Sequence, residues 1–306
     1  MSITLIENFR AVFYAPFYAS FALNAYEAEN VEVQRVMSER PAETMQAVMR
    51  GDGDVAWGGP IRLLKGDNKR TEGGLAIFCD VVGRDPFFLL GREPNPTYQP
   101  GDLHGKSLAV VSEVPTPWLC LQHDLRLAGI DPADLDWTQE RSMPENVEAL
   151  RAGEVDVIQL FQPFVEQVLD DQIGHIWYAA ADRGSTAYTA MYAPQSLLNE
   201  KSEEFLRMTR AVYRTQGWIA SHEAADLAER VADFFPDVPR PRLTSALARY
   251  KQLGLWNQTP IIPQVGFDWL KSACLSGGFI DRDVPFEQCV DMRFADQVIQ
   301  EPPAPL

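Results

Sequence analysis

The sequence has few basic residues: across 306 residues, 27 lysines and arginines stand against 43 aspartates and glutamates, a formal net charge of −16. Binding to a nucleic-acid backbone or an anionic membrane surface requires clustered Lys and Arg, and no such cluster occurs. No apolar run approaches the roughly 20 residues that a membrane-spanning helix needs. We therefore expect a globular protein that binds neither nucleic acid nor an anionic membrane.

Cysteine and histidine are also scarce. Four cysteines lie far apart, without the close pair spacings of zinc or redox sites: Cys79, Cys120, Cys274 and Cys289. We expect them to be buried small apolar residues rather than disulfide or catalytic residues. The four histidines are isolated in sequence from any nucleophile or metal partner. These absences predict no cofactor, no metal and no catalysis.

An export signal is also missing from the printed N-terminus. The first residues enter a strand-like alternation without a basic start, an apolar segment or a small-residue cleavage site. This pattern is compatible with a cytoplasmic protein and equally with a chain whose leader has been removed.

A repeated pattern is the most informative feature that is present. The segment Gly-Asp-Gly-Asp-Val-Ala-Trp-Gly-Gly-Pro at 51–60 returns as Gly-Glu-Val-Asp-Val-Ile-Gln-Leu-Phe-Gln-Pro at 153–163. In each copy a glycine ends a predicted helix (41–50 and 144–152), an aspartate begins a strand, and a proline opens the next helix. The chain therefore contains the same helix–strand–helix unit twice.

Other segments extend this alternation. We predict strands at 3–6, 31–37 and 106–112, helices at 16–28 and about 118–128, and mainly helices after residue 194, including 202–220 and 224–235. Alternating strands and helices form parallel sheets covered on both faces, and ligands bind beyond the carboxyl ends of the strands. The two repeated strand ends, 57–59 and 159–162, should therefore face each other across a cleft.

Several short motifs point to a family. They are Ala15-Pro-Phe-Tyr-Ala19, the repeated turn at 51–59, Asp102-Leu-His-Gly-Lys-Ser-Leu-Ala-Val at 102–110, Ala-Gly-Glu-Val-Asp-Val at 152–157, and Gly278-Phe-Ile with Val290-Asp-Met-Arg-Phe294. Together they resemble the thiamine-precursor-synthase-like (NMT1/THI5-like) branch of the periplasmic-binding-protein fold. That branch includes solute-binding components of sulfonate, nitrate and pyrimidine ABC transporters.

The resemblance implies an α/β fold of the type II periplasmic-binding-protein kind. Each of two lobes would hold a mainly parallel sheet flanked by helices, with the ligand cleft between the lobes and closure by hinge motion. We expect residues 1–94 and 187–306, including the C-terminal helices, to form the first lobe and 95–186 the second. The connecting segments are expected near 91–96 and 183–188.

The resemblance also implies a function. We expect a monomeric solute-binding protein that captures a small molecule for an ABC permease and ATPase, in the periplasm. The alternatives are a cytoplasmic enzyme of pyrimidine or aromatic metabolism, or a ligand sensor on the same fold. The eukaryotic precursor synthases carry a cysteine-rich motif and a reactive histidine, and the motif has no counterpart here, which favours binding without turnover.

Candidate ligand contacts in the first lobe are aromatic. Trp57, followed by Gly58 and Gly59, suits a flat ligand, because glycines let the backbone approach while an indole offers a stacking face. Core packing is an equal alternative for Trp57. The segment after the first strand supplies further candidates with the same alternative: Asn8, Phe9 and Tyr14.

The turn Ser112-Glu-Val-Pro-Thr-Pro-Trp118 supplies Glu113, Thr116 and Trp118 as candidates from the second lobe. It precedes a helix, where free amides usually favour anions. Two prolines remove donors and Glu113 adds a negative charge, so a phosphate or sulfonate is expected less at this turn than a neutral or amine-bearing ligand. Alternatively Thr116 caps the helix and Glu113 interacts with its dipole.

Four polar residues complete the candidate site. Arg183 could grip a carboxylate with a bidentate fork, and Gln159 and Gln162 could supply hydrogen bonds. Arg84 is a weaker candidate, because it is expected to pair with the neighbouring Asp85. The aromatic candidates, the acidic turn and Arg183 together favour a planar heterocycle or an aromatic or other organic acid.

Overall fold

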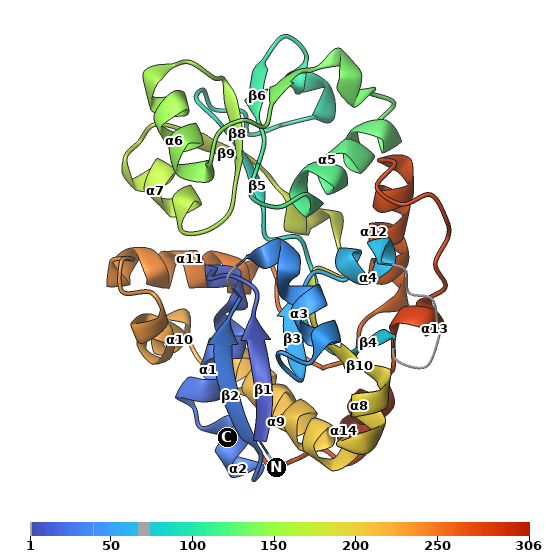
Figure 1. Cartoon of the computed structure of the whole chain (residues 1–306). Helices are drawn as coiled ribbons and strands as arrows, with labels where there is room; N and C mark the ends of the chain where they lie inside the picture. Colours follow the sequence, from blue (N-terminus) through green and yellow to red (C-terminus); the bar gives the residue numbers. More distant parts are fainter. Residues whose placement is uncertain (1, 39, 67–73) are drawn as a thin grey trace.

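Two α/β lobes, one above the other in Figure 1, make up the computed structural model, which describes residues 2–38, 40–66 and 74–306. The first sheet has the order β2 (Glu32–Met37), β1 (Ser2–Glu7), β3 (Val55–Gly58), β10 (Thr189–Pro194) and β4 (Leu75–Val82). The second has the order β7 (Asp136–Thr138), β6 (Ser107–Ala109), β8 (Val157–Leu160), β5 (Phe88–Gly91) and β9 (His175–Ala179). Only β10 and β5 run against the other strands of their sheets, so the predicted mainly parallel, two-sheet fold is confirmed.

The repeated sequence occupies the central strand of each sheet. Helix α3 (Thr44–Arg50) leads to β3, and α6 (Met143–Ala152) leads to β8, each through a glycine in the left-handed region at φ 82° and 75°. The Asp54 carboxylate accepts a hydrogen bond from the Thr4 amide at 2.7 Å, and Asp156 accepts one from Ser107 at 3.1 Å. The repeated aspartate therefore attaches the central strand of each sheet to its neighbour, β1 or β6.

Helices cover both sheets. In chain order the remaining ones are η1 (Val12–Tyr14), α1 (Ala15–Ala22), α2 (Ala25–Ala28), η2 (Pro41–Glu43), α4 (Ile61–Lys65), η3 (Pro100–Leu103), α5 (Thr116–Leu127), η4 (Pro132–Asp134), α7 (Phe164–Asp170), η5 (Ala180–Arg183), α8 (Gln195–Glu200), α9 (Ser202–Ser221), α10 (Ala224–Val231), η6 (Ala232–Phe234), α11 (Arg240–Gln252), α12 (Gln264–Ser276), α13 (Phe286–Cys289) and α14 (Arg293–Gln300). The predicted single helix at 16–28 is instead broken, because Asn24 adopts a left-handed conformation at φ 52° between α1 and α2.

Two segments connect the lobes. The chain leaves the first sheet after β4, through residues 83–87, and returns from β9 to β10 through residues 180–188. The predicted first connection at 91–96 is too late in the chain, because β5 already pairs with β8 and β9 of the second sheet. The predicted second connection at 183–188 lies within the observed one, and the exact lobe boundaries stay predictions.

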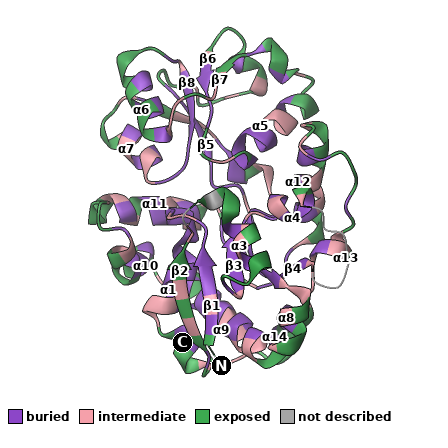
Figure 2. Ribbon diagram, viewed as in Figure 1, coloured by how far each residue is buried: buried purple, intermediate pink, exposed green. Residues whose placement is uncertain are grey.

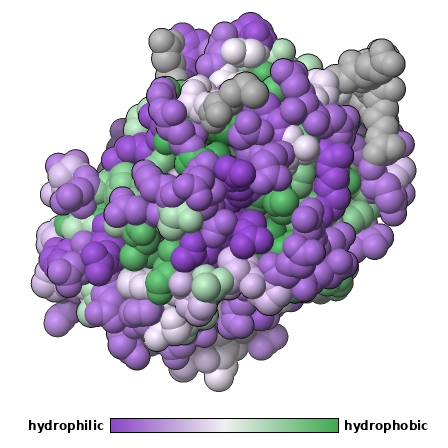
Figure 3. All heavy atoms as spheres, turned by 90° about the horizontal axis from the view of Figure 1, so that it is seen from below, coloured by the Kyte–Doolittle hydropathy of each residue, from purple (hydrophilic) through white to green (hydrophobic). Residues whose placement is uncertain are grey.

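Burial follows this layering. In Figure 2 the strands are mostly buried, apart from the edge strands β2, β7 and β9, and the helices expose their outer faces. The end of the first lobe far from the second is mostly hydrophilic with small apolar areas between (Figure 3). All four cysteines are buried, as predicted. None of the described helices is both long and apolar enough to cross a bilayer.

Candidate functional site

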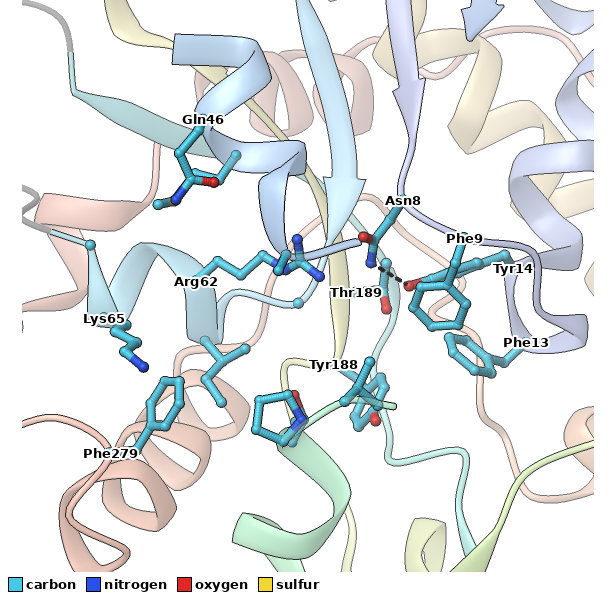
Figure 4. Close-up of a pocket in the computed structure, with 18 residues that line it drawn as sticks. Asn8, Phe9, Phe13, Tyr14, Gln46, Arg62, Lys65, Tyr188, Thr189 and Phe279 are labelled. Carbon is cyan, nitrogen blue, oxygen red and sulfur yellow. Dashed lines mark hydrogen bonds between the residues drawn. The ribbon is translucent and has the colours of Figure 1, made fainter. Parts of the chain in front are cut away.

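A cavity of about 430 Å³ lies where the first lobe, the second connecting segment and one turn of the second lobe meet (Figure 4). Its lining is formed by Asn8, Phe9, Phe13, Tyr14, Ala42, Met45, Gln46, Gly59, Ile61, Arg62, Lys65, Gly66, Val114, Pro115, Thr116, Tyr188, Thr189 and Phe279. The first lobe and its C-terminal part contribute most of these residues. The second lobe contributes only residues 114–116, from the turn between β6 and α5.

The segment that follows β1 forms the aromatic wall. Asn8 donates a hydrogen bond from Nδ2 to the Tyr14 hydroxyl at 3.5 Å and accepts one at Oδ1 from Thr44 at 3.1 Å. Burial raises the pKa of Tyr14 to about 12, against smaller opposite effects of the Asn8 hydrogen bond and the Arg62 charge. Tyr14 is therefore a neutral hydroxyl at physiological pH, with Phe9 at 5.3 Å between ring centroids.

Helix α4 forms the cationic wall. It begins after Pro60 and carries Arg62 and Lys65 three residues apart, a spacing that places both on one side of a helix. Lys65 Nζ lies 4.3 Å from the ring centroid of Phe279, which comes from the C-terminal part of the chain. None of the described lining residues is an aspartate or a glutamate. The described lining therefore carries two basic side chains and no acidic one, in a protein of net charge −16.

One buried hydroxyl in the wall lacks an internal partner. Thr189, at the start of β10, is fully buried, and its Oγ1 has no hydrogen-bond partner among the described residues. A buried polar atom without a partner carries a desolvation cost, which a ligand atom in the cavity could offset.

Five of the predicted ligand contacts come together around this cavity: Asn8, Phe9, Tyr14, Gly59 and Thr116. They arrive from the segment after β1, the turn after β3 and the start of α5. Their roles in binding stay predictions. Gly59 places the first repeated strand end at the cavity, as expected for a ligand site beyond the strand ends, whereas the second, 159–162, does not line it.

Trp57 and Gly58 lie outside the lining. The Trp57 side chain is fully buried and stacks on Phe17, with ring centroids 4.5 Å apart and planes at 11°. It also contacts Tyr14 and Tyr18, so it fills the space between β3 and α1. The structure thus favours core packing, the alternative weighed for Trp57, over stacking on a ligand.

Arg183 and Arg84 are also occupied elsewhere. The Arg183 guanidinium pairs with Asp85 at 2.6 Å and with Asp124 through Nε at 3.0 Å, and it lies 4.7 Å from the Trp269 ring centroid. Arg84 donates to the Ala181 carbonyl oxygen at 3.3 Å instead of pairing with Asp85. The predicted carboxylate grip by Arg183 is therefore replaced by an internal ion pair.

The side chains of the other second-lobe candidates contact residues of their own lobe. The Glu113 carboxylate accepts a hydrogen bond from the Met143 amide at 2.8 Å, and Trp118 packs against Trp137 at 4.7 Å between ring centroids. Gln159 donates to the Pro117 carbonyl oxygen at 3.0 Å, and Gln162 donates to Glu166 at 2.7 Å. None of these four lines the cavity.

Sequence reasoning missed most of the remaining wall, notably Phe13, Arg62, Lys65, Tyr188, Thr189 and Phe279. A signal for the two cations was available, because they lie three residues apart in a short helix directly after the repeated turn. Phe279 carried no such signal, since it reaches the cavity from more than 200 residues further along the chain.

Cofactor and metal chemistry find no support in the lining. None of its described residues is a cysteine or a histidine. Within residues 2–38, 40–66 and 74–306, no group of three or more His, Cys, Asp or Glu side chains is placed to hold a metal ion.

Two sheets of this strand order, with a cavity between the lobes, define the periplasmic-binding-protein fold, as predicted. The predicted resemblance is also confirmed, because the model of the NMT1-like family matches residues 96–232. The chain is similar over 301 residues, at 23% identity, to YtlA of Bacillus subtilis (strain 168), whose name proposes a binding function; the match covers 98% of this chain and 90% of YtlA.

Solved structures show the same fold. The periplasmic aliphatic sulphonate binding protein SsuA from Escherichia coli matches with a TM-score of 0.76 and 15% identity, covering 94% of this chain and 97% of SsuA. The desulfurization enzyme DSZB matches with a TM-score of 0.68 and 14% identity, covering 98% of this chain and 99% of DSZB. The fold is thus shared by a binding protein and an enzyme, so function has to be argued from the site.

Proposed function

We propose that this protein is a solute-binding protein that holds a small organic anion in the cavity between its lobes. The observation that carries the proposal is the pair of cations, Arg62 and Lys65, in a lining whose described residues include no carboxylate. An anion enters such a site favourably because charge-assisted hydrogen bonds replace the water that it loses.

The rest of the lining suits an apolar or aromatic body. Phe9, Phe13, Tyr188 and Phe279 line the cavity, whose volume of about 430 Å³ lies in the usual range for small-molecule sites. A sulfonate or carboxylate head on a small hydrocarbon body matches both features. An uncharged heterocycle matches less well, because it carries no negative charge for the two basic side chains of the lining.

The turn at 112–118 opposes a sulfonate less in the folded protein than its sequence suggests. Glu113 lies outside the lining and accepts the Met143 amide hydrogen bond at the start of α6, so its charge is directed to another helix. Three solved neighbours of the same fold are named as sulfonate-binding proteins: the aliphatic sulphonate binding protein of Escherichia coli, an alkanesulfonate-binding protein of Xanthomonas axonopodis pv. citri bound to MOPS, and the sulfonate-binding protein of Methylobacillus flagellatus KT.

Transport fits this site better than turnover. The described lining lacks the cysteine, histidine and carboxylate side chains that usually act as nucleophiles or general bases. Burial raises the pKa of Cys79, Cys120 and Cys274, which opposes thiolate formation. We infer that the protein delivers its ligand unchanged to an ABC permease, in the periplasm. In support, one solved neighbour is named as the periplasmic sulfonate-binding protein of a sulfonate ABC transporter, and another as a periplasmic aliphatic sulphonate binding protein.

Isothermal titration calorimetry with benzenesulfonate, benzoate and the neutral benzamide tests the proposal. We expect both anions to bind more tightly than benzamide. Replacing Arg62 or Lys65 with Gln should weaken anion binding about 10- to 150-fold, because a hydrogen bond to a charged group contributes about 1.5–3 kcal/mol. Mass spectrometry of the recovered anion should show it unchanged.

Arg50→Gln is the matched control. It removes the same charge from α3 on an exposed side chain that pairs with Asp52 outside the cavity, so anion affinity should stay within about twofold. Equal affinity for benzamide and the two anions, or equal losses in the Arg62 and Arg50 variants, would reject the anion site. Conversion of the anion would instead support an enzyme.

A further inference from the structure

A second cavity, of about 410 Å³, lies on the other side of the segment that follows β1. Its walls are Ala11 and Val12 of the first lobe, Phe161 and Phe164 of the second lobe, and residues 234–238 after α10. This lining is largely apolar, apart from Arg10, which pairs with Glu7 at 3.0 Å, and Asp237. The second cavity therefore also lies between the lobes, but its described lining holds one acidic residue beside its one basic residue.

The two cavities share one wall. Along the segment after β1, Phe9, Phe13 and Tyr14 line the cationic cavity, while residues 10–12 line the apolar one. Figure 4 shows Phe9, Phe13 and Tyr14 together at one end of the cationic cavity. A single short stretch of chain thus separates two chambers of similar volume.

Two aromatic rings close this wall across the lobes. Phe13 lines the cationic cavity and meets Phe161, which lines the apolar cavity, in an edge-to-face contact with ring centroids 5.3 Å apart. Phe87, in the first connecting segment, supports Phe161 from another side at 5.2 Å. Both rings of the pair are buried, Phe13 at 1% and Phe161 at 6% exposure, so the contact is well packed.

We propose that Phe161 is a specificity-determining residue, which sets the maximum length of the apolar body that an anionic ligand can carry. It does not line the cationic cavity, but it holds Phe13 at the end of that cavity and blocks passage into the apolar chamber. The inference rests on the proposed anion-binding function. It adds that the wild-type cleft selects short hydrocarbon bodies and that removal of one ring admits longer ones.

The length dependence follows from burial of methylene groups. Each methylene that moves from water to an apolar site strengthens binding about fourfold, until the chain meets the end of the site. In the wild type this gain should stop at the Phe13–Phe161 contact. In Phe161→Ala the chambers join, so the gain should continue over several further methylenes.

Calorimetric titration with linear alkanesulfonates, from ethanesulfonate to decanesulfonate, tests this inference. We expect Phe161→Ala to bind the longest sulfonates at least tenfold more tightly than the wild type does, and to bind ethanesulfonate within twofold of wild type. Phe164→Ala is the matched control, because Phe164 lines the apolar chamber and its ring centroid lies 6.1 Å from that of Phe161. It enlarges that chamber but leaves the Phe13–Phe161 contact in place, so it should keep the wild-type length profile.

Circular dichroism and thermal melting establish that each variant is folded. If Phe161→Ala does not fold, Phe161→Leu carries the test with a smaller shift in the same direction. Wild-type affinity that keeps rising to decanesulfonate, or a folded Phe161 variant with the wild-type profile, would overturn the inference while leaving anion binding intact. Failure of the wild type to bind any sulfonate or carboxylate would reject the proposed function, and this inference with it.

Discussion

Replacement of Arg183 with Met should destabilise the protein strongly, because Arg183 joins both connecting segments to both lobes. Its guanidinium is 6% exposed and pairs with Asp85 of the first connecting segment, whose side chain is fully buried. It also forms hydrogen bonds through Nε to both oxygens of Asp124 in α5, at 3.1 and 3.0 Å. Removing one member of a buried ion pair costs about 3–5 kcal/mol, because the remaining charge is left uncompensated.

The expected loss for Arg183→Met lies in the lower part of that range. The Asp124 side chain is 18% exposed and can regain water, whereas Asp85 cannot. The methionine also keeps apolar contact with Trp269 while the cation–π attraction, at 4.7 Å, is lost. Denaturation by guanidinium chloride, followed by circular dichroism, should therefore show a loss of about 3–4 kcal/mol at pH 7.

The pH dependence of this loss identifies its cause. Burial raises the pKa of Asp85 even though Arg183 lowers it, and without Arg183 the folded-state pKa rises further. When the pKa of an acidic group is higher in the folded state than its unfolded value of about 3.9, the free energy of unfolding falls as pH rises between the two values. The stability that Arg183→Met loses relative to the wild type should therefore become smaller as pH falls from 7 to 5.

A second substitution and a control complete the test. Adding Asp85→Asn should restore part of the lost stability at pH 7, since Asn can still accept the Phe87 amide hydrogen bond without a charge. Arg50→Met, which breaks an exposed pair, should cost no more than about 1 kcal/mol. A deficit in Arg183→Met that is below 1 kcal/mol, or that is independent of pH, would refute the account of Arg183 as a buried counter-charge.

Two further predictions concern buried groups elsewhere. Burial raises the pKa of Asp80 well above its ordinary value, and its Oδ1 has no hydrogen-bond partner among the described residues. The free energy of unfolding of the wild type should therefore fall by about 1.4 kcal/mol per pH unit as pH rises from the unfolded-state pKa to the folded-state pKa. Asp80→Asn should remove this fall, so denaturation at pH 5 to 8 should show a flatter dependence of stability on pH. Gly266 in α12 lies against the second connecting segment, where a Cβ would approach Ser185 Oγ to 2.4 Å and the Ala187 amide nitrogen to 3.1 Å. Gly266→Ala should therefore lower the unfolding free energy by about 1–3 kcal/mol. Gly217→Ala in α9 meets nothing within 4 Å and should raise it by about 0.5–1 kcal/mol; the same sign for both glycine variants would contradict the packing argument.

The fold was largely predictable because its signals are local. A glycine after a helix and an aspartate before a strand repeat at both central strands, and the structure gives both aspartates the same hydrogen bond to a neighbouring strand. The first connection was misplaced because the sequence does not show that the strands before and after Gly83 to Pro86 belong to different sheets. Sequence period shows that a segment is buried, but not which sheet it joins.

The site was less predictable because side-chain direction at a strand end depends on tertiary packing. Trp57 and Gly59 are two residues apart, yet Trp57 stacks in the core while Gly59 lines the cavity. Arg183 looked available as an isolated cation near a connecting segment. Its two partners, Asp85 and Asp124, lie 98 and 59 residues away, and no local pattern links them to it.

The net charge of the whole chain is a poor guide to the charge inside its cavity. The value of −16 is a sum over the whole chain, and charges on the surface are screened over about 8 Å at physiological ionic strength. Arg62 and Lys65 line the cavity, and a ligand there would lie closer to them than to the acidic residues on the distant surface, so the short-range attraction outweighs the long-range repulsion. An acidic composition therefore argues against a polyanionic partner that must cover a large surface. It does not argue against a small anion held by two cations in one cavity.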